Sequence, residues 1–334
     1  MKKLIALLLA VLMLLTLAAC GGTETAAPAE SGSTASSASS GAKLRFVTGG
    51  ESGTYYAFGS VIAQHATNNA GVNVVGLVGN GSQANVMELQ DGNAELAFCQ
   101  SDVMAYAYNG TNLFEETGKV DCFSTVAALY MEQVQIVTTD ASIKSVADLA
   151  GKRVSIGSAG SGVYFNAIDI LGAYGLTEND IIPTYQSFGD SANDIKDGKI
   201  DAAFIVAGAP TTAITDLATT KDVYLVSLDD EHIESLCATS DYYTKNVIPA
   251  DVYGTDGDVT TVAVGAVILA RDDVSEDAIY NFTKDLFDNA EAEVSSHAKY
   301  GELNLDFAAS VTSVPYHPGA AKYFAEKGYT VPTK

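Results

Sequence analysis

Short apolar runs alternate with helix-like stretches along most of the chain. Runs rich in Val, Ile, Phe and Ala that end in a turn signal predict strands, and longer stretches of mixed polarity between them predict helices. The predicted strands are 43–48, 72–78, 96–99, 134–138, 154–157, 183–186, 202–206 and 260–270. The predicted helices are 55–67, 82–90, 162–174, 191–196, 276–297 and 318–327. Such alternation predicts an α/β fold in which helices cover both faces of mixed or parallel sheets.

Two distant segments of the chain carry similar signatures in the same order. The first copy comprises 52–56, 84–85 and 91–98, and the second comprises 161–165, 192–193 and 197–204. Each copy also follows an arginine that opens a strand, Arg45 or Arg153. Solenoid proteins repeat at short periods, so two distant copies instead indicate two similar α/β lobes. Two such lobes facing each other would enclose a cleft.

The strands 134–138 and 260–270 are predicted to cross between these lobes. The first lobe is then discontinuous and comprises 43–138 and 260–334, while the second lobe is the insertion 139–259. A crossover of two strands is a hinge, and hinged lobes can close around a ligand.

The N-terminus has the pattern of an export signal. Lys2 and Lys3 precede an apolar run from 4 to 19, which is too short for a comfortable membrane span. The sequence Leu-Ala-Ala-Cys at 17–20 resembles the lipobox of bacterial lipoproteins. We therefore expect a signal peptide over 1–19 and acylation of Cys20, which would anchor the protein outside the cytoplasm on the bacterial cell membrane. Residues 20–42 are small and polar, and they are predicted to form a flexible tether.

Charge and cysteine content exclude some classes of function. The formal net charge of −23 argues against nucleic acid and against anionic lipid as partners. It does not exclude an anionic ligand, because a pocket can be locally electropositive. Three cysteines follow Cys20, namely Cys99, Cys122 and Cys237; free thiols are favoured, and a Cys99–Cys122 disulfide is the alternative. The four histidines lack metal-ligand spacing, so we predict no metal, no cofactor and no catalytic residues.

Two glycine-rich loops, 49–54 and 157–162, each join a predicted strand to a predicted helix. Glycines let the backbone approach a ligand, and the first N–H groups of a helix attract a carboxylate or phosphate. The alternative is a plain strand-to-helix turn with serine as N-cap. Because the loops form a pair, we favour ligand binding. Neither loop matches a nucleotide-binding fingerprint or a nucleophile elbow.

Aspartates and arginines are less promising as ligand-binding groups. Asp91-Gly92 and Asp197-Gly198 are typical of helix ends with glycine in the left-handed conformation, rather than of catalytic carboxylates. The only arginines, Arg45, Arg153 and Arg271, lie at strand ends. We therefore expect backbone N–H groups and hydroxyls, not a guanidinium clamp, to hold an anion.

Together these motifs resemble the TAXI family, the solute receptors of tripartite ATP-independent periplasmic (TRAP) transporters. The resemblance rests on the export signal and on segments 49–56, 81–85, 157–162, 206–210, 261–264 and 315–320, and it covers nearly all of 43–334. It implies a type II periplasmic-binding-protein fold, no enzymatic activity, and delivery of a small anionic solute to a polytopic TRAP permease. Characterised members are associated mainly with glutamate-like amino acids and dicarboxylates. Ser52 stands where members often carry Gly or Thr, so the ligand itself does not carry over.

Two other functions are compatible with parts of this pattern. A monomeric receptor that feeds a sensor kinase or an ABC permease would have the same sequence features, and an extracytoplasmic hydrolase would need a nucleophile and base that the motifs do not supply. The expected ligand-binding residues are Gly53, Thr54, Tyr55, Ser82, Asn85, Gln100, Ser158, Gly160, Ser161, Gly162, Val163, Phe188, Ala207, Gly208 and Pro210.

Overall fold

A computed structural model describes residues 43–334. The predicted signal peptide, Cys20 with its predicted acylation, and the predicted tether lie outside the described residues. Within 43–334, no helix combines the length and apolar character needed to cross a bilayer.

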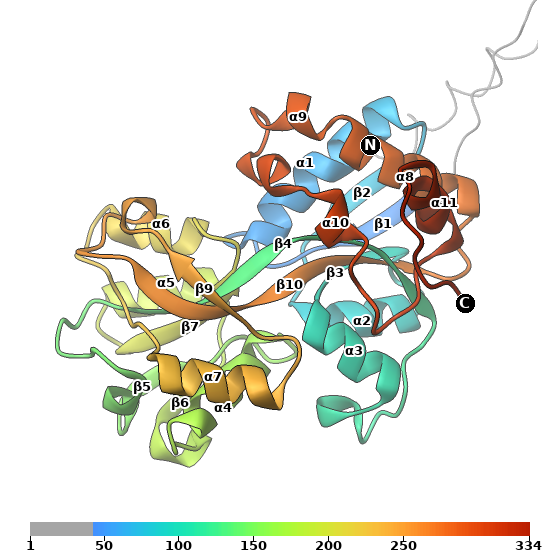
Figure 1. The fold of residues 1–334 in the computed structure, drawn as a ribbon. Coiled ribbons are helices and arrows are strands. Elements are labelled where there is room, and N and C mark those ends of the chain that lie inside the picture. The colour runs from blue at the N-terminus through green and yellow to red at the C-terminus, as the bar shows by residue number, and fades with distance from the viewer. Residues whose placement is uncertain (1–42) are drawn as a thin grey trace, which may run out of the picture. The chain divides into compact units, whose positions relative to one another are not determined.

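One mixed β-sheet runs through the described residues (Figure 1). Its central path has the order β2-β1-β3-β10-β4-β7-β5-β6, with β8 paired to β4 and β9 paired to β10. Strands are parallel within β2-β1-β3 and within β7-β5-β6, whereas β10 and β4 run antiparallel between these groups. The strands are β1 (Lys43–Val47), β2 (Asn73–Leu77), β3 (Leu96–Gln100), β4 (Phe123–Thr138), β5 (Arg153–Ser155), β6 (Ile182–Thr184), β7 (Ala202–Ala207), β8 (Tyr224–Leu225), β9 (Thr244–Ile248) and β10 (Val259–Arg271).

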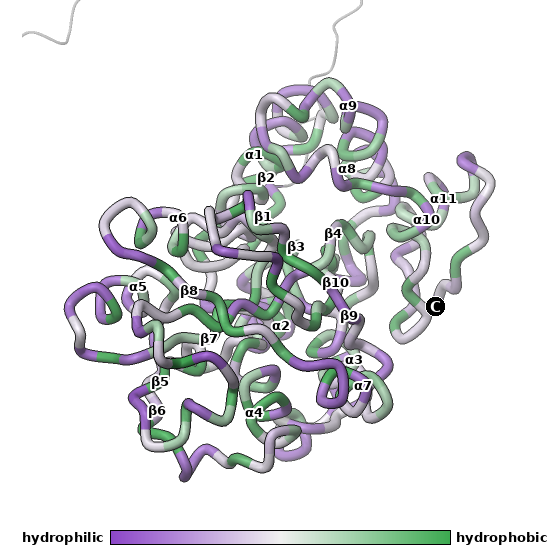
Figure 2. Tube along the Cα trace, turned by 60° about the vertical axis from the view of Figure 1, so that its left-hand side comes forward, coloured by the Kyte–Doolittle hydropathy of each residue, from purple (hydrophilic) through white to green (hydrophobic). Residues whose placement is uncertain are grey.

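Helices connect the parallel strands and cover the sheet. The α-helices are α1 (Thr54–Asn69), α2 (Ser82–Gln90), α3 (Ser101–Asn109), α4 (Val163–Ala173), α5 (Phe188–Lys196), α6 (Thr212–Ala218), α7 (Asp230–Thr239), α8 (Glu276–Asp288), α9 (Ala290–Glu293), α10 (Leu305–Ala308) and α11 (Pro318–Glu326). Short 3₁₀ turns are η1 (Asn112–Phe114), η2 (Val146–Leu149), η3 (Glu178–Asp180), η4 (Ala250–Val252) and η5 (Ala298–Glu302). Figure 2 shows the hydrophobic stretches following the strands, while hydrophilic residues gather in loops and at helix surfaces.

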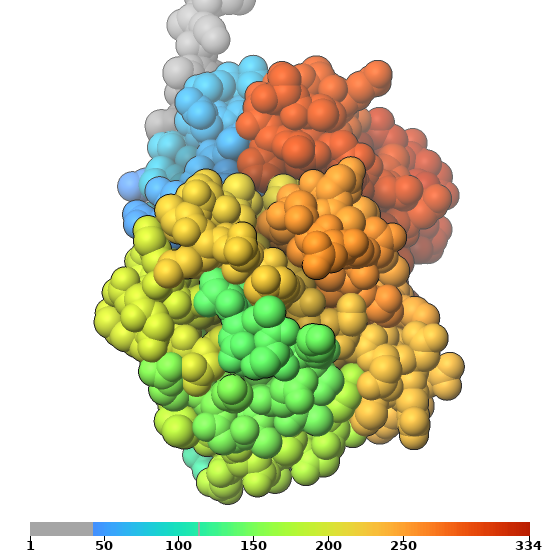
Figure 3. Space-filling view, turned by 90° about the vertical axis from the view of Figure 1, so that its left-hand side faces the viewer, coloured from blue at the N-terminus to red at the C-terminus, as the bar shows by residue number. Residues whose placement is uncertain are grey.

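Separate hydrophobic cores divide the sheet into two lobes. In β4 the buried side chains belong to one core up to Tyr130 and to another from Val134, and in β10 the change falls between Val264 and Ala266. We call the elements around the first core lobe I: β1–β3, α1–α3, α8, α11 and the adjoining halves of β4 and β10. Lobe II contains β5–β7, with α4 and α7 packed on one core and α5 and α6 on another. Figure 3 views the molecule from lobe II, whose green, yellow and orange residues cover most of that face.

Several predicted elements differ from those observed. The crossing strand predicted at 134–138 begins at Phe123, and α3, α6, α7 and β9 were not predicted. The single helix predicted over 276–297 is wrong: it is divided into α8 and α9, because Asn289 (φ −103°, ψ 1°) leaves helical geometry. His297 is extended rather than helical. Cys99, Cys122 and Cys237 are free thiols, so the alternative Cys99–Cys122 disulfide is not formed.

Candidate functional site

A cavity of about 460 Å³ lies between the two lobes. Lobe I contributes the loop 49–55, the loop 78–82 and the side chains of Gln100 and Glu132. Lobe II contributes Ser158, residues 161–163 after β5, residues 187–190 with Asn193 around the start of α5, and Val206 with Ala207 at the end of β7. Carboxyl ends of parallel strands thus meet at this cavity, as is typical of ligand sites in open α/β sheets.

Three helices with glycine at the N-cap begin at the cavity without a side-chain cap. The N-cap residues of α1, α2 and α4 are Gly53, Gly81 and Gly162, and none provides a side chain to accept from the first-turn N–H groups. These helices have 16, 9 and 11 residues, so each presents an ordinary helix dipole. In contrast, Ser187 caps α5 by accepting from the Asp190 N–H at 3.1 Å. The three uncapped ends leave donors available to an anion in the cavity.

Two buried polar atoms at the cavity lack a partner. Ser161 is 5% exposed and Gln100 is 2% exposed, and both line the cavity. Ser161 Oγ and Gln100 Oε1 have no hydrogen-bond partner among residues 43–334. Because buried polar atoms without a partner are costly, these two atoms show that the polar contacts of the cavity wall are incomplete in this structure.

A buried polar network joins the lobes beside the cavity. Gln100 Nε2 donates to Asn166 Oδ1 at 2.9 Å, and Asn166 Nδ2 donates to Asp102 Oδ2 at 3.0 Å and to Tyr243 Oη at 2.9 Å. Tyr243 donates in turn to Asp169 at 2.8 Å. Burial raises the pKa of the Asp102 carboxyl to about 6. We call Gln100, Asp102 and Asn166 the interlobe latch, because they connect β3 and α3 of lobe I to α4 of lobe II.

Two further hydrogen bonds between the lobes accept on backbone carbonyls. The Ala84 N–H of lobe I donates to Gly160 O of lobe II at 2.9 Å, and Thr54 Oγ1 donates to Gly208 O at 2.8 Å. A Cβ atom on Gly81 would lie only 2.9 Å from Ser161 Cα, and Gly81 has φ +105°. Only glycine allows both this approach and this backbone conformation.

The side chains that line the cavity include acids but no Lys, Arg or His. Glu51 and Asp190 are exposed at its rim, and Glu132 is 2% exposed inside it. Burial raises the pKa of Glu132 well above the usual range for a glutamate. Its Oε2 accepts from Tyr55 Oη at 2.8 Å, and the Tyr55 ring stacks on Phe98 with centroids 4.5 Å apart.

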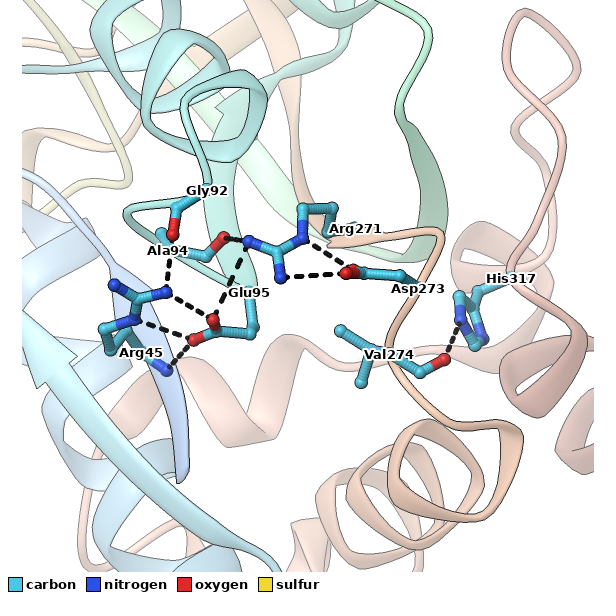
Figure 4. A network of polar contacts seen from close by, with 8 residues as sticks. All are labelled: Arg45, Gly92, Ala94, Glu95, Arg271, Asp273, Val274 and His317. Carbon is cyan, nitrogen blue, oxygen red and sulfur yellow. Dashed lines mark hydrogen bonds and ion pairs between the residues drawn. The ribbon is translucent and has the colours of Figure 1, made fainter. Parts of the chain in front are cut away.

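The three arginines lie elsewhere, in ion pairs with acids. Arg45 Nε donates to Glu95 Oε2 at 3.0 Å, and Arg153 Nε donates to Asp201 Oδ2 at 3.0 Å. Arg271 donates to Asp273 and to Ala94 O (Figure 4). The sequence expectation that no arginine belongs to the cavity agrees with this placement.

The repeated arginines and Asp-Gly pairs build one structural device twice. Arg45 donates to Gly92 O and Arg153 donates to Gly198 O, the turn glycines that follow α2 and α5. Both glycines have φ +71°, the left-handed conformation that ends a helix. Asp91 and Asp197 are the C-cap residues of these helices and do not line the cavity.

Eleven of the residues predicted to bind ligand line the cavity. They are Gly53, Thr54, Tyr55, Ser82, Gln100, Ser158, Ser161, Gly162, Val163, Phe188 and Ala207. Four others lie outside the lining and support it. Asn85 donates to the Phe98 carbonyl, Gly160 and Gly208 accept the interlobe bonds described above, and Pro210 follows a cis peptide bond.

Sequence reasoning missed Glu132, Glu51 and the neighbours of Phe188 around the start of α5, namely Ser187, Gly189 and Asp190. The available signal for Glu132 was an acid within a strand that has no other charged residue, Phe123–Thr138. Within the described part of the chain, no group of three or more His, Cys, Asp or Glu side chains is arranged to hold a metal.

A family model described as NMT1-like family matches residues 46–328, which is most of the chain. The chain belongs to the NMT1-like family. A solved structure from Bordetella bronchiseptica RB50 is 15% identical and has a TM-score of 0.51, covering 86% of this chain and 81% of that chain. The fold of this NMT1-like chain is therefore shared with known structures.

Two further solved structures are similar to this chain. The alkanesulfonate-binding protein SsuA from Xanthomonas axonopodis pv. citri, bound to MOPS, is 16% identical with a TM-score of 0.48, covering 85% of this chain and 83% of that chain. A putative L-cystine ABC transporter from Listeria monocytogenes is 17% identical with a TM-score of 0.47, covering 81% of this chain and 99% of that chain. The observed architecture, one mixed sheet covered by helices, is the α/β fold class that the sequence predicted.

Proposed function

We propose that the chain is an extracytoplasmic receptor that captures a small solute with a carboxylate group between its lobes and delivers it to a membrane permease. The observation that carries this proposal is the convergence of three uncapped helix ends on a cavity that also contains the unpartnered atoms Ser161 Oγ and Gln100 Oε1. The cavity volume of 460 Å³ is within the range of small-molecule sites.

The solute is a glutamate-like amino acid or a dicarboxylate, and the partner is a TRAP-type permease. Both statements rest on the motif resemblance. The statement about the solute is also supported by the cavity lining, which among residues 43–334 has no cationic side chain and so leaves the helix ends as the anion site. The protein is a monomer that acts without enzymatic activity, held at the membrane through lipidated Cys20. The alternatives are a receptor for a sensor kinase or an ABC permease.

Calorimetry of the mature protein against amino acids, C4–C5 dicarboxylates and alkanesulfonates tests the ligand class. We expect one acid to bind per chain, and binding only of a sugar or a peptide would contradict the proposal. The permease is tested by uptake into proteoliposomes that contain the receptor and the polytopic protein encoded beside it. Uptake driven by an ion gradient without ATP would support TRAP, and uptake that requires ATP would replace it with an ABC system.

A further inference from the structure

The ionisable side chains that line the cavity are all acids, which restricts the charge of the ligand it can bind. Helix ends can hold an anionic group, but the lining side chains carry acids only. The nearest buried cation, Lys299, is not part of the lining: its Nζ donates to Ala209 O at 3.0 Å and to Glu302 Oε1 at 2.6 Å. A solute with a second carboxylate therefore finds no counter-charge on these side chains, whereas a solute with an ammonium group does.

Glu132 is the acid placed to receive such a group. It stands on β4 where the strand passes from the core of lobe I to that of lobe II, opposite Val264 of β10. Its Oε2 accepts from Tyr55, but its Oε1 has no hydrogen-bond partner within 43–334. Although Oε1 has no partner, it is not completely buried. Glu132 lines the cavity, so Oε1 is accessible from there.

Tyr55 couples this acid to the anion site. Its backbone belongs to the first turn of α1, one of the three uncapped helix ends, and its hydroxyl orients Glu132. Stacking on Phe98 holds the ring in place. Tyr55 thus fixes the position of an anion-binding helix end relative to that of an acidic acceptor. The first suits the carboxylate of an amino acid, and the second suits its ammonium group.

We propose that Glu132 binds the ammonium group of the solute, so that the cavity selects an amino acid over the dicarboxylate with the same carbon chain. This inference rests on the proposed function, because it requires that a small acid occupies the cavity.

A proton balance follows from the surroundings of Glu132. Tyr55 from α1, Cys99 from β3, Asp102 from α3, Tyr130 from β4 itself and Lys299 from η5 are the titratable groups that act on it. Burial raises the pKa of Glu132 well above its usual range, with Asp102 adding to the rise and Tyr55 and Lys299 opposing it. Burial in the empty site thus favours the protonated form of Glu132. An ammonium ion at Oε1 favours the carboxylate form instead, and a proton displaced in this way passes to solvent while the N–H bonds of the ligand stay intact.

The decisive comparison is between L-glutamate and glutarate, which differ by the amino group. We expect wild-type protein to bind L-glutamate at least about tenfold more tightly than glutarate, since a hydrogen bond to a charged group accounts for a difference of this size. Calorimetry in buffers of different ionisation enthalpy should show proton release with L-glutamate and none with glutarate.

Glu132→Gln keeps the size of the side chain and an acceptor for Tyr55. It should lose the proton release and the preference for L-glutamate, while binding of glutarate is retained. The matched control is Glu291→Gln, the same change on the exposed surface of α9, which should behave as wild type. Tyr55→Phe, a second variant, removes the hydrogen bond that lowers the pKa of Glu132, so the pH at which proton release is half-complete should rise.

The inference is overturned if wild type does not distinguish the two acids, or if Glu132→Gln still prefers L-glutamate. Those outcomes leave the receptor proposal standing, because wild type still binds an acid. If wild type binds neither these two acids nor any other small acid, both proposals are overturned together.

Discussion

At the scale of single residues, Gly162 marks the tightest approach between the lobes. A Cβ atom there would lie 1.4 Å from Gln100 Oε1 and 2.6 Å from Gln100 Cδ. Gln100 cannot move aside freely, because it is buried and its Nε2 donates to Asn166. Any side chain at 162 therefore competes with the interlobe latch.

We predict that Gly162→Ala weakens solute binding by about tenfold or more, since it costs at least one buried hydrogen bond on closure. Ser161→Ala should have a smaller effect, because it removes one hydroxyl without obstructing the lobes.

Gly172→Ala on α4, the helix that Gly162 caps, is the control: a Cβ atom there meets nothing within 4 Å. It should bind as wild type and gain about 0.5–1 kcal/mol of stability. Calorimetry and thermal unfolding measure both effects, and wild-type affinity in Gly162→Ala would show that the lobes need not approach so closely.

Asp102 provides a prediction about pH. Its pKa in the closed structure is raised from 3.8 to about 6, chiefly by burial. The folded state of such an acid binds its proton more tightly than the unfolded state does. The free energy of unfolding therefore falls as pH rises from about 4, near the unfolded pKa, to about 6, the folded pKa. Asparagine cannot ionise, but its NH2 group cannot accept the second of the two hydrogen bonds that the Asp102 oxygens accept from Val103 N–H and Asn166 Nδ2. Asp102→Asn should therefore lose a hydrogen bond at every pH, but it should lack the fall in stability that wild type shows between about pH 4 and about pH 6.

This comparison is made by urea unfolding at saturating solute, which favours the closed arrangement in which Asp102 is covered. The rise in the pKa of Asp102 from 3.8 to about 6 corresponds to about 3 kcal/mol of stability at most. Titrating groups that Asp102 does not influence are common to both proteins and cancel in the difference, whereas Glu132, whose pKa the charge of Asp102 raises, contributes to it. Parallel stability curves across this pH range would mean that Asp102 remains solvated.

At the scale of elements, the repeated arginines act as clasps within each lobe. Arg45 ties β1 to the turn before β3, and Arg153 ties β5 to the turn before β7 (Figure 4 shows the first). We expect Arg45→Gln and Arg153→Gln to lower the melting temperature but to change solute affinity by less than about tenfold, because neither side chain reaches the cavity. A hundredfold loss of affinity in a folded variant would place a guanidinium in the site.

Elements whose signals are local could be predicted from the sequence. Helix α2 was predicted at its observed bounds, because a glycine precedes Ser82 and an Asp-Gly pair follows Gln90. The start of β4 could not be predicted in this way. Its residues 123–130 are uniformly buried in a tertiary core, and the polar residues Glu132 and Gln133 interrupt the apolar run that would have joined them to 134–138.

Most of the residues expected at the site line the cavity, because glycine-rich strand-to-helix loops identify the helix ends that surround it. Side-chain direction depends on tertiary contacts: Asn85, which was expected to bind ligand, lies outside the lining and donates to the Phe98 carbonyl. Glu132 was missed because its burial depends on Tyr55 and on the meeting of both lobes, which no local pattern encodes.

At the scale of the whole described unit, closure is carried by two strands. β4 and β10 pass between the cores, and the cavity lies beside Glu132 at this crossing. Rotation about the crossing would separate Gln100 from Asn166 and Ala84 from Gly160. A solute that contacts both lobes stabilises the closed state by its differential affinity, so small-angle scattering should show a smaller radius of gyration at saturating solute. An unchanged profile would indicate a site formed on one lobe alone.

A variant of the interlobe latch tests closure through hydrogen bonds that the lobes make with each other rather than with the solute. In the closed state Asn166 accepts from Gln100 and donates to Asp102, whereas after opening these groups can bind water. Asn166→Leu keeps the branched shape and the number of side-chain heavy atoms, but it leaves Asp102 Oδ2 and Gln100 Nε2 buried without partners only when the lobes close, which shifts the equilibrium toward the open state. We expect this variant to bind solute at least about tenfold more weakly and to need correspondingly more solute to reach the smaller radius of gyration. The control is Asn193→Ala, which removes an amide from the cavity lining but not from the latch; it should leave the radius of gyration of the solute-free protein unchanged. If Asn166→Leu contracts at the same solute concentration as wild type, the latch does not stabilise closure, and contacts made by the solute must close the lobes alone.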